Sequence, residues 1–348
     1  MSFRIENRDV GPGHPCYVVA EMSANHDQDF ARAEALVRKA SDCGADAIKL
    51  QTFTADTITL DVNRPPFTLE HGLWKGQTLH ELYQKAAMPW EWQPRLKALA
   101  DSLGIHLFSS PFDPTAVDFL EAMGVGAFKV ASFEITDIPL VQRIARTGKP
   151  VIISTGMASL GEIDEVVRAA REAGANAIAL LRCNSAYPAS DEDMNLASIP
   201  HLAATFGVPV GLSDHTRGVE AAVTAVALGA CIIEKHFHLG DGTSLDSEFS
   251  LDPEQLAEMV RAIRKTERMI GHVRYGPSPS EVGNATFRRS LYACRDIAEG
   301  EAFTDANVRS VRPGGGLHPR HLREIVGLVA RRPLKYGEPL TWSDVGSD

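Results

Sequence analysis

The sequence predicts an α/β protein in which a closed (β/α)8 TIM barrel is followed by a small β-rich domain. Short apolar runs alternate with amphipathic helical patterns eight times between residues 16 and 270. Near-continuous apolar strands separated by helices are typical of a parallel sheet with both faces covered, and eight repeats suit a closed barrel. The alternation stops near residue 275, where shorter strand-like pieces begin. A doubly wound open sheet is the alternative arrangement of the same repeats.

The repeated elements can be placed from their apolar periodicity. The eight predicted strands are residues 16–24, 46–53, 105–111, 127–132, 150–155, 177–183, 208–214 and 230–237. The predicted helices are residues 30–43, 92–103, 114–123, 138–146, 160–173, 197–206, 218–228 and 253–270. Gly44 and Gly174 follow two of these helices, at the position where glycine commonly ends a helix before the next strand.

A long insert, residues 54–88, interrupts the repeat after the second strand. It contains Pro65-Pro66, Trp74 and Tyr83, and a connection of this length outside the repeat is usually functional. We expect it to form a lid or a rim of the barrel rather than part of its core.

The sequence divides into a TIM barrel (residues 1–275), a linker containing proline, serine and glycine (276–286) and a small domain (287–348). Strand-like pieces in the small domain lie at residues 287–294, 302–304, 308–311 and 339–341. A module of this size is only marginally stable alone, so we expect it to pack against a partner.

Composition restricts the class of protein. The formal net charge is −10 and the Lys and Arg residues form no long cluster, which argues against nucleic-acid binding. The five cysteines are widely spaced and include no CxxC pair, so a disulfide framework is not expected. The sequence has no run of 18 apolar residues and no basic-then-apolar N-terminus. We therefore expect a cytoplasmic protein without a membrane segment.

Polar residues stand at the carboxyl ends of the predicted strands. Ligands of TIM barrels bind at this end, so these residues are the candidates for a site. They are Glu21, Lys49, Gln51, Ser110, Lys129, Ser132, Glu134, Asn184, Ser185, Tyr187, Ser213, His215, Glu234 and His236. Residues two apart on a strand share a face, so the last residues of neighbouring strands can point into the barrel together.

The lysines among these candidates indicate an anionic ligand. Buried lysines are costly unless they are paired, so Lys49 and Lys129 suggest a bound phosphate or carboxylate. Hydroxyl groups of Ser110, Ser132 and Ser213 can complete a phosphate site. Each residue alone also has a structural explanation, such as helix capping or an ion pair with a neighbouring glutamate. The recurrence of polar residues at nearly every strand end favours a ligand site.

Two of the predicted strands end in histidine, at His215 and His236. A pair of imidazoles can hold a divalent transition metal and leaves positions open for water or substrate oxygens. The pattern therefore predicts an exchangeable, catalytic metal ion.

Six strand-end motifs together resemble the sialic acid synthase family. They are Ala-Glu-Met-Ser-Ala-Asn-His at 20–26, Lys-Leu-Gln-Thr at 49–52, Phe-Ser-Ser-Pro-Phe-Asp at 108–113, Lys-Val-Ala-Ser-Phe-Glu at 129–134, Gly-Leu-Ser-Asp-His-Thr at 211–216 and Glu-Lys-His-Phe at 234–237. The small domain, with Phe-Arg-Arg-Ser-Leu-Tyr at 287–292 and Val-Arg-Pro-Gly at 311–314, resembles that family's antifreeze-like (SAF) domain. The resemblance covers almost the whole chain.

The resemblance implies a metal-dependent transferase that condenses phosphoenolpyruvate with an open-chain amino-sugar aldehyde and water, forming a nonulosonic acid and phosphate. The divalent metal, for which Mn, Mg and Co are candidates, would be held by His215 and His236. Phosphoenolpyruvate would contact Lys49, Ser110, Lys129, Ser132, Ser213 and either Asn184 or Ser185, and the sugar would contact Glu21, Gln51, Tyr187 and Asp246. The acid–base candidates are Glu134, Glu21 and Asp246, with Glu134 preferred for activating water.

Within the family the chain is most similar to the pseudaminate branch, because of its variants at residues 21–26 and 109–110 and its segment 73–83. This similarity implies 2,4-diacetamido-2,4,6-trideoxy-L-altrose as the sugar; synthesis of N-acetylneuraminate or legionaminate from another aldehyde is the alternative. In this family the small domain covers the barrel of the other subunit, which implies a domain-swapped homodimer. Arg312 would then reach the sugar bound in that barrel.

Two other functions agree with parts of the sequence. A Schiff-base aldolase on the same barrel would use Lys49 or Lys129 as its nucleophile. A non-catalytic carbohydrate-binding or ice-binding protein would depend on the small domain alone. The full set of strand-end polar residues counts against this last interpretation.

Overall fold

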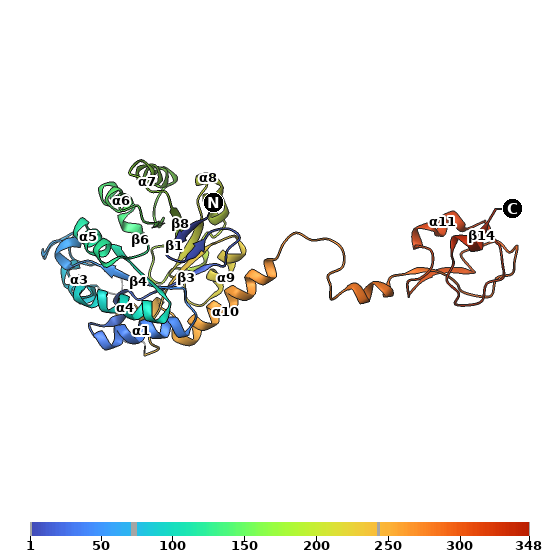
Figure 1. Ribbon diagram of the computed structural model, residues 1–348, viewed down its shortest axis with the longest axis horizontal. Helices are drawn as coiled ribbons and strands as arrows, with labels where there is room; N and C mark the ends of the chain where they lie inside the picture. Colours follow the sequence, from blue (N-terminus) through green and yellow to red (C-terminus); the bar gives the residue numbers. More distant parts are fainter. Residues whose placement is uncertain (1, 71–74, 242–243, 348) are drawn as a thin grey trace. The chain divides into compact units, whose positions relative to one another are not determined.

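The computed structural model describes residues 2–70, 75–241 and 244–347. The chain divides into two compact units, Met1–Gly271 and His272–Asp348 (Figure 1). Leu73 and Trp74, which belong to the predicted rim segment and to the segment typical of the pseudaminate branch, lie outside the described residues.

Eight parallel strands form a closed barrel in the first unit, which confirms the predicted fold class. They are β3 (Tyr17–Glu21), β4 (Ala47–Thr52), β5 (His106–Pro111), β6 (Phe128–Val130), β7 (Val151–Ser154), β8 (Ile178–Cys183), β9 (Val210–Asp214) and β10 (Ile232–His236). Each strand lies inside one of the predicted apolar runs. The strands follow chain order around the ring, and β10 pairs with β3 to close it.

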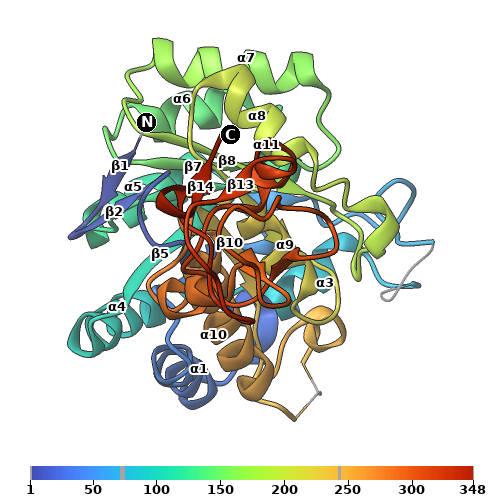
Figure 2. The same ribbon diagram turned by 90° about the vertical axis from the view of Figure 1, so that its right-hand side faces the viewer.

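Helices surround this barrel (Figure 1). They are α1 (Phe30–Asp42), α4 (Gln93–Leu103), α5 (Pro114–Met123), α6 (Ile138–Ala145), α7 (Leu160–Glu172), α8 (Ser198–Phe206), α9 (Glu220–Ala227) and α10 (Pro253–Ile270). Neighbouring helices pack together, as α6 does with α7 and α1 with α10 (Figure 2). Their apolar faces cover the outer surface of the strands, so the strands are buried on both faces.

Local sequence signals place the helix ends. Asp113 begins α5 by accepting hydrogen bonds from the backbone of Thr115 and Ala116, with Pro114 in the first turn. Gly44 and Gly174 follow α1 and α7 with φ of +83° and +105°, a conformation that favours glycine over other residues.

A hairpin that the sequence analysis did not predict precedes the barrel. It consists of β1 (Phe3–Ile5) and β2 (Arg8–Val10), and the side chains of Ile5 and Val10 are fully buried. Arg8 pairs with Asp46, directly before β4. The hairpin therefore packs at the amino-terminal end of the strands, opposite the end where a site is expected.

The insert after β4 contains two short helices, α2 (Ala55–Ile58) and α3 (Leu79–Ala86). Each begins with a capping box. The side chain of the threonine before the helix accepts from the backbone N–H of the third helical residue, whose own side chain accepts from the backbone N–H of the threonine. Polar side chains of the insert thus determine where these two helices begin.

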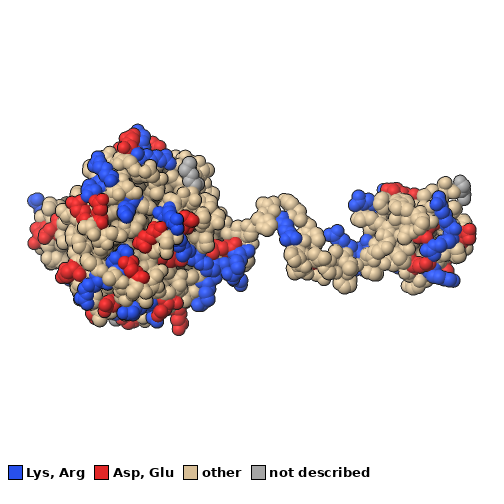
Figure 3. Space-filling view, in the orientation of Figure 1, with Lys and Arg blue, Asp and Glu red and all other residues tan. Residues whose placement is uncertain are grey.

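The second unit has a separate hydrophobic core built around residues such as Leu291, Phe303, Ile325, Leu334 and Leu340. Its regular elements are β11 (Ser290–Ala293), β12 (Val308–Val311), α11 (Leu322–Ile325), β13 (Val329–Ala330) and β14 (Val345–Gly346). Figure 3 shows Lys/Arg and Asp/Glu side chains together on the drawn face of each unit.

Two of the predicted strand-like pieces in this unit are wrong. Residues 302–304 and 339–341 form only isolated bridges, from Ala302 to Val329 and from Pro339 to Tyr292. A proline cannot donate to a ladder, and two-residue strands such as β13 are too short to show an alternating pattern. Among the described residues, no helix combines the length and apolarity needed to cross a membrane.

Candidate active site

The carboxyl ends of the barrel strands bring most of the predicted site residues together. Lys49 of β4 is buried among polar groups from three other strands: its Nζ lies 2.7 Å from Glu21 Oε2 and 3.9 Å from Glu234 Oε1, and it donates to Ser110 Oγ at 3.2 Å. Gln51 Nε2 donates to Glu21 Oε1 at 3.0 Å. Burial alone would lower the pKa of Lys49, but the two carboxylates raise it, so this lysine is positively charged.

Lys129 of β6 forms the second cationic centre. Its Nζ donates to Ser154 Oγ at 2.7 Å and lies 3.5 Å from Glu234 Oε1, which also accepts from Ser213 Oγ at 3.1 Å. Burial lowers the pKa of Lys129. Burial would raise the pKa of Glu234, but Lys129 and Lys49 hold it below its usual value.

Glu234 therefore lies between the two lysines as their shared counter-ion. The sequence analysis placed it at a strand end but assigned it no role. Two ammonium groups around one firmly ionised carboxylate leave a local excess of positive charge where a phosphate or carboxylate can bind.

Glu21 contributes less negative charge than its sequence suggests. Its side chain is 1% exposed, and burial raises its pKa to about 7 although Lys49 acts in the opposite direction. This raised pKa brings the carboxyl toward the range in which it can take up or release a proton near neutral pH.

A small cradle of hydroxyl groups lies beside the lysines. Gly156 N donates to Ser132 Oγ at 3.1 Å, and a Cβ on Gly156 would lie 2.1 Å from Ser185 Oγ and 2.7 Å from Ser132 Oγ. Only glycine leaves this space open. The sequence analysis missed Gly156, although a glycine two residues after the end of β7 was the available signal.

The structure distinguishes Asn184 from Ser185. The Asn184 side chain donates to Asp193 O at 3.4 Å and accepts from Ala186 N at 2.9 Å, so its polar atoms are used within its own loop. Ser185 lies in the cradle with Ser132 and Gly156. Of the two candidates, Ser185 is the one positioned with the other hydroxyl groups.

His215 and His236, on neighbouring strand ends, have ring centroids 5.2 Å apart. His215 Nδ1 donates to Asn184 O at 2.7 Å, which leaves the lone pair of Nε2 available. Nδ1 of His236 is buried and has no hydrogen-bond partner in the described part of the chain. Burial and the neighbouring cations keep the pKa of His236 well below its ordinary value, so this imidazole is neutral.

This donor set fits a divalent metal ion. His236 has an imidazole nitrogen without a partner, and His215 beside it already uses its Nδ1, so both rings have a nitrogen that could bind a divalent ion. Within residues 2–70, 75–241 and 244–347, no three His, Cys, Asp or Glu side chains are grouped as a metal site. Water or substrate oxygens would therefore complete the coordination.

Tyr187 and Phe249 form a wall beside the histidines. The Tyr187 ring lies 4.3 Å from the His215 ring and 5.1 Å from the Phe249 ring, centroid to centroid. Burial raises the pKa of Tyr187 well above its ordinary value, so the phenol stays protonated and can donate to a ligand. Cys183 was not predicted here: burial would raise its pKa, but His215, 3.9 Å from its thiol, lowers it to about 7.

Asp246 is fixed by the loop that follows β3. Its Oδ2 accepts from Ala24 N at 3.1 Å, and burial raises its pKa. Asn25, also fully buried, donates to Phe237 O and Ser250 Oγ and accepts from Ser244 Oγ. These bonds connect the strand that ends in Glu21 to the segment that carries Asp246.

Glu134 lies in a 3-10 helix, Ser132–Glu134, that follows β6. Its Oε2 is buried and without a hydrogen-bond partner among the described residues. Burial raises its pKa to about 7, with Lys129 acting in the opposite direction. A carboxyl with this pKa is suited to general acid–base catalysis near neutral pH.

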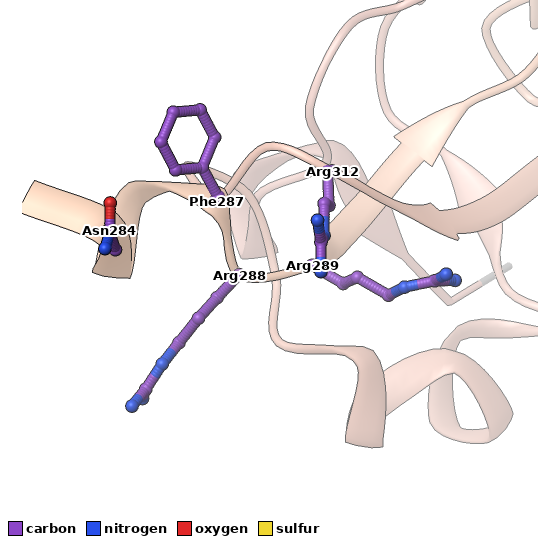
Figure 4. A pocket seen from close by; sticks show the side chains of 5 residues that line it. All are labelled: Asn284, Phe287, Arg288, Arg289 and Arg312. Carbon is purple, nitrogen blue, oxygen red and sulfur yellow. The ribbon is translucent and has the colours of Figure 1, made fainter. Parts of the chain in front are cut away.

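Arg312 belongs to the second unit, so the structure does not group it with the barrel residues. It lines a hollow of about 570 Å³ with Asn284, Phe287, Arg288 and Arg289. Figure 4 shows Arg312 and Arg289 close together, whereas Arg288 extends away from them. Three guanidinium groups give this hollow a preference for anionic or polar ligands.

Comparisons with known proteins find relatives over nearly the whole chain. A pseudaminic acid synthase of Campylobacter jejuni subsp. jejuni serotype O:23/36 is 42% identical over 329 residues, which cover 94% of this chain and 96% of the relative. An N,N'-diacetyllegionaminic acid synthase of Legionella pneumophila is 36% identical, with 96% of each chain covered. The solved structure of the spore coat polysaccharide biosynthesis protein SpsE of Bacillus subtilis is 33% identical, covers 99% of each chain and superposes with a TM-score of 0.67.

Family models match both parts of the chain. The SAF domain matches residues 288–346, and the NeuB family matches residues 36–275. With this match over most of the chain, and with relatives of this identity over nearly its full length, the chain belongs to the NeuB family.

Proposed function

We propose that the protein condenses phosphoenolpyruvate with 2,4-diacetamido-2,4,6-trideoxy-L-altrose and water to give pseudaminic acid and phosphate. One observation carries the proposal: two buried lysines, a cradle of serine hydroxyls and two adjacent imidazoles meet at the carboxyl end of a single barrel. The higher identity to a pseudaminic acid synthase than to a legionaminic acid synthase supports the choice of sugar.

The lysines and the cradle would bind phosphoenolpyruvate. Lys49 and Lys129 supply positive charge, and Ser110, Ser132 and Ser185 supply hydroxyl donors. The same groups favour departure of phosphate, because they stabilise the dianion that forms when its C–O bond breaks. Ser213 and Glu234 hold the two ammonium groups in place.

His215 and His236 would hold the metal, and Tyr187, Gln51, Glu21 and Asp246 would face the sugar. When bound, a divalent ion at this position supplies a Lewis acid for the aldehyde oxygen. The two imidazole rings are adjacent, and the Tyr187 ring lies against that of His215, so a sugar bound here would contact the phenol.

The methylene carbon of phosphoenolpyruvate forms a bond to the aldehyde carbon, and water adds to C2 of the phosphoenolpyruvate moiety. Glu134 is the group that we assign to the proton released by this water, because its buried carboxyl titrates near pH 7. Loss of phosphate from the resulting tetrahedral centre gives the keto acid.

We also infer a homodimer in which the small domain of one subunit covers the barrel of the other. Several side chains around the junction of the units are apolar and exposed within one chain, among them Met269, Val273, Tyr275 and Val282, and Tyr275 is 93% exposed. Large apolar side chains that are exposed in a single chain are candidates for contact with a partner. Arg312 would then complete the sugar site of the other subunit.

The proposal is tested by measuring phosphate release from phosphoenolpyruvate with a panel of amino-sugar aldehydes. The assay is repeated after EDTA treatment and again after addition of Mn²⁺, Mg²⁺ or Co²⁺. We expect release only with aldehyde and metal present, and fastest with the altrose derivative. Faster release with the precursor of N-acetylneuraminate or legionaminate would show that this sugar is the substrate, and the proposed reaction would still hold. Borohydride trapping of substrate on Lys49 or Lys129, with full activity in EDTA, would instead indicate a Schiff-base aldolase.

A further inference from the structure

Asp214 and Lys235 form an ion pair without any exposed side-chain surface, between the two strands that carry the site histidines. Lys235 Nζ donates to Asp214 Oδ2 at 2.8 Å. The two residues are direct partners in the register of β9 and β10. Each therefore stands immediately before a histidine: His215, which follows β9, and His236, the last residue of β10.

Lys235 also contacts the residue on the other side of His215. Its Nζ donates to the backbone oxygen of Thr216, and Thr216 Oγ1 lies 3.4 Å away. Asp214 Oδ1 accepts from Thr216 N at 2.9 Å and from Thr216 Oγ1 at 2.7 Å. Both chain neighbours of His215 are thus tied to the strand that ends in His236.

The ion pair lies on the face of the strands opposite to the histidines. Successive side chains of a strand point to opposite faces, so residues 214 and 235 face away from the barrel interior when residues 215 and 236 face into it. The pair therefore reaches the site only through the backbone that it holds.

Stability alone does not account for this pair. Desolvation of two buried charges offsets much of their attraction, and apolar replacements of similar volume are often neutral or stabilising. The side chains of the cluster instead bond to one another and to the backbone N and O of Thr216, next to His215.

We propose that Asp214, Lys235 and Thr216 position His215 relative to His236 and so set the separation of the two imidazoles that bind metal. They are positioning residues without contact to ligand. The inference rests on the proposed function, because it assigns the imidazole pair to a divalent ion.

The test compares the wild type with the double variant Asp214→Asn/Lys235→Met in the full-length protein. The introduced asparagine retains the oxygen that accepts from Thr216, and the introduced methionine removes the ammonium without leaving an unpaired charge. Mn²⁺ affinity is measured by equilibrium dialysis and the Mn²⁺ environment by electron paramagnetic resonance, beside kcat, KM for phosphoenolpyruvate and thermal unfolding. We expect Mn²⁺ affinity to weaken by about tenfold or more and kcat to fall, with KM for phosphoenolpyruvate within about twofold.

Arg264→Met is the matched control. It removes an ion pair with Asp46 at the amino-terminal end of the strands, away from the histidines. This variant should change thermal stability and leave Mn²⁺ affinity at the wild-type value. Thr216→Val removes two contacts of the cluster without altering charge. If the double variant does not fold, the same measurements on Thr216→Val test the positioning role.

The outcomes separate the two proposals. Wild-type protein that binds no Mn²⁺ would refute the metal site, and the positioning role with it. Wild-type protein that binds Mn²⁺, together with folded variants whose Mn²⁺ affinity, spectrum and kcat match it, would overturn the positioning role alone.

Discussion

Glu21 is buried and Glu134 is partly buried at the same end of the barrel, and burial raises the pKa of each carboxyl to about 7. Their environments differ: Glu21 is paired with Lys49 at 2.7 Å and accepts from Gln51, whereas Glu134 forms no ion pair with any described residue. A carboxylate that is not engaged in an ion pair is the better general base, which is why we assign the water proton to Glu134.

Glu134→Gln should lower kcat by about a hundredfold or more, because it removes the base. In the wild type, kcat should increase with pH near pH 7 as Glu134 ionises. The glutamine variant should lack this increase. Steady-state phosphate release between about pH 5.5 and 8.5 checks both, a range that spans the raised pKa. Glu258→Gln, on the exposed face of α10, is the charge-matched control. The assignment would be contradicted if kcat of the variant still increased with pH near 7 and was reduced by less than about fivefold.

The same substitution should change stability in a pH-dependent way. The folded-state pKa of Glu134 lies above the ordinary value of 4.5, so ionising it in the folded protein costs free energy as the pH rises from about 4.5 through about 7. The glutamine variant lacks that cost, which is at most about 3 kcal/mol. The Tm of Glu134→Gln relative to wild type should therefore increase between about pH 5 and pH 8, and a constant difference would argue against a raised pKa.

Gly156→Ala should raise KM for phosphoenolpyruvate by about tenfold or more, because the new Cβ would overlap Ser185 Oγ and displace the cradle. Metal affinity should be unchanged. Gly161→Ala is the control: a Cβ there meets nothing closer than 3.9 Å, and alanine favours the helix by about 0.5–1 kcal/mol. If Gly156→Ala leaves KM at the wild-type value, the cradle does not bind phosphate.

At the scale of elements, the site depends on loops that are held by buried polar residues. Asn25, after β3, makes hydrogen bonds to Phe237, Ser244 and Ser250, and the latter two flank Asp246. These bonds tie Ser244 and Ser250, on either side of Asp246, to the residues that follow β3.

Asn25→Ala should raise KM for the sugar more than KM for phosphoenolpyruvate, and it should destabilise the protein by about 1–3 kcal/mol because buried partners lose their hydrogen bonds. Tyr17→Phe is a matched control, since it removes a buried hydroxyl bonded to His106 at the amino-terminal end of the strands, away from the site. Thermal unfolding should shift in both variants, and KM for the sugar only in Asn25→Ala. An equal effect on both KM values would mean that Asn25 acts on the whole barrel.

The helices and strands of the barrel were predictable because each satisfies a local rule. Apolar runs of strand length, helices with one apolar face and glycines after α1 and α7 all act within a few residues of sequence. The hairpin of β1 and β2 was not predicted, because each strand has three residues and its burial comes from contacts with the barrel.

At the scale of the whole molecule, the two units have separate hydrophobic cores, and the proposed dimer is the state in which Arg312 completes a site. The apolar residues exposed around residues 269–282 agree with this arrangement.

Mixed dimers test the exchange of domains. Arg312→Ala and Lys129→Ala should each be nearly inactive, but co-expression should restore about a quarter of wild-type activity, because about half of the dimers are mixed and each has one intact site. The recovered activity is measured as phosphate release by the purified co-expressed protein. The control is a mixture of the two separately expressed variants, combined immediately before the assay. No recovery in mixed dimers would mean that each small domain serves its own barrel.

The sequence by itself determined the barrel, the small domain and the types of residue at the strand ends, because these follow from periodicity and from the rule that barrel ligands bind at the carboxyl ends. Only the tertiary structure decided which of these residues act on one another. It placed Glu234 between Lys49 and Lys129, Ser185 rather than the Asn184 side chain in the cradle, and Gly156 where no side chain fits. Distances between side chains on different strands, and the burial that raises the pKa of Glu134, depend on the closed ring as a whole, so no local pattern records them.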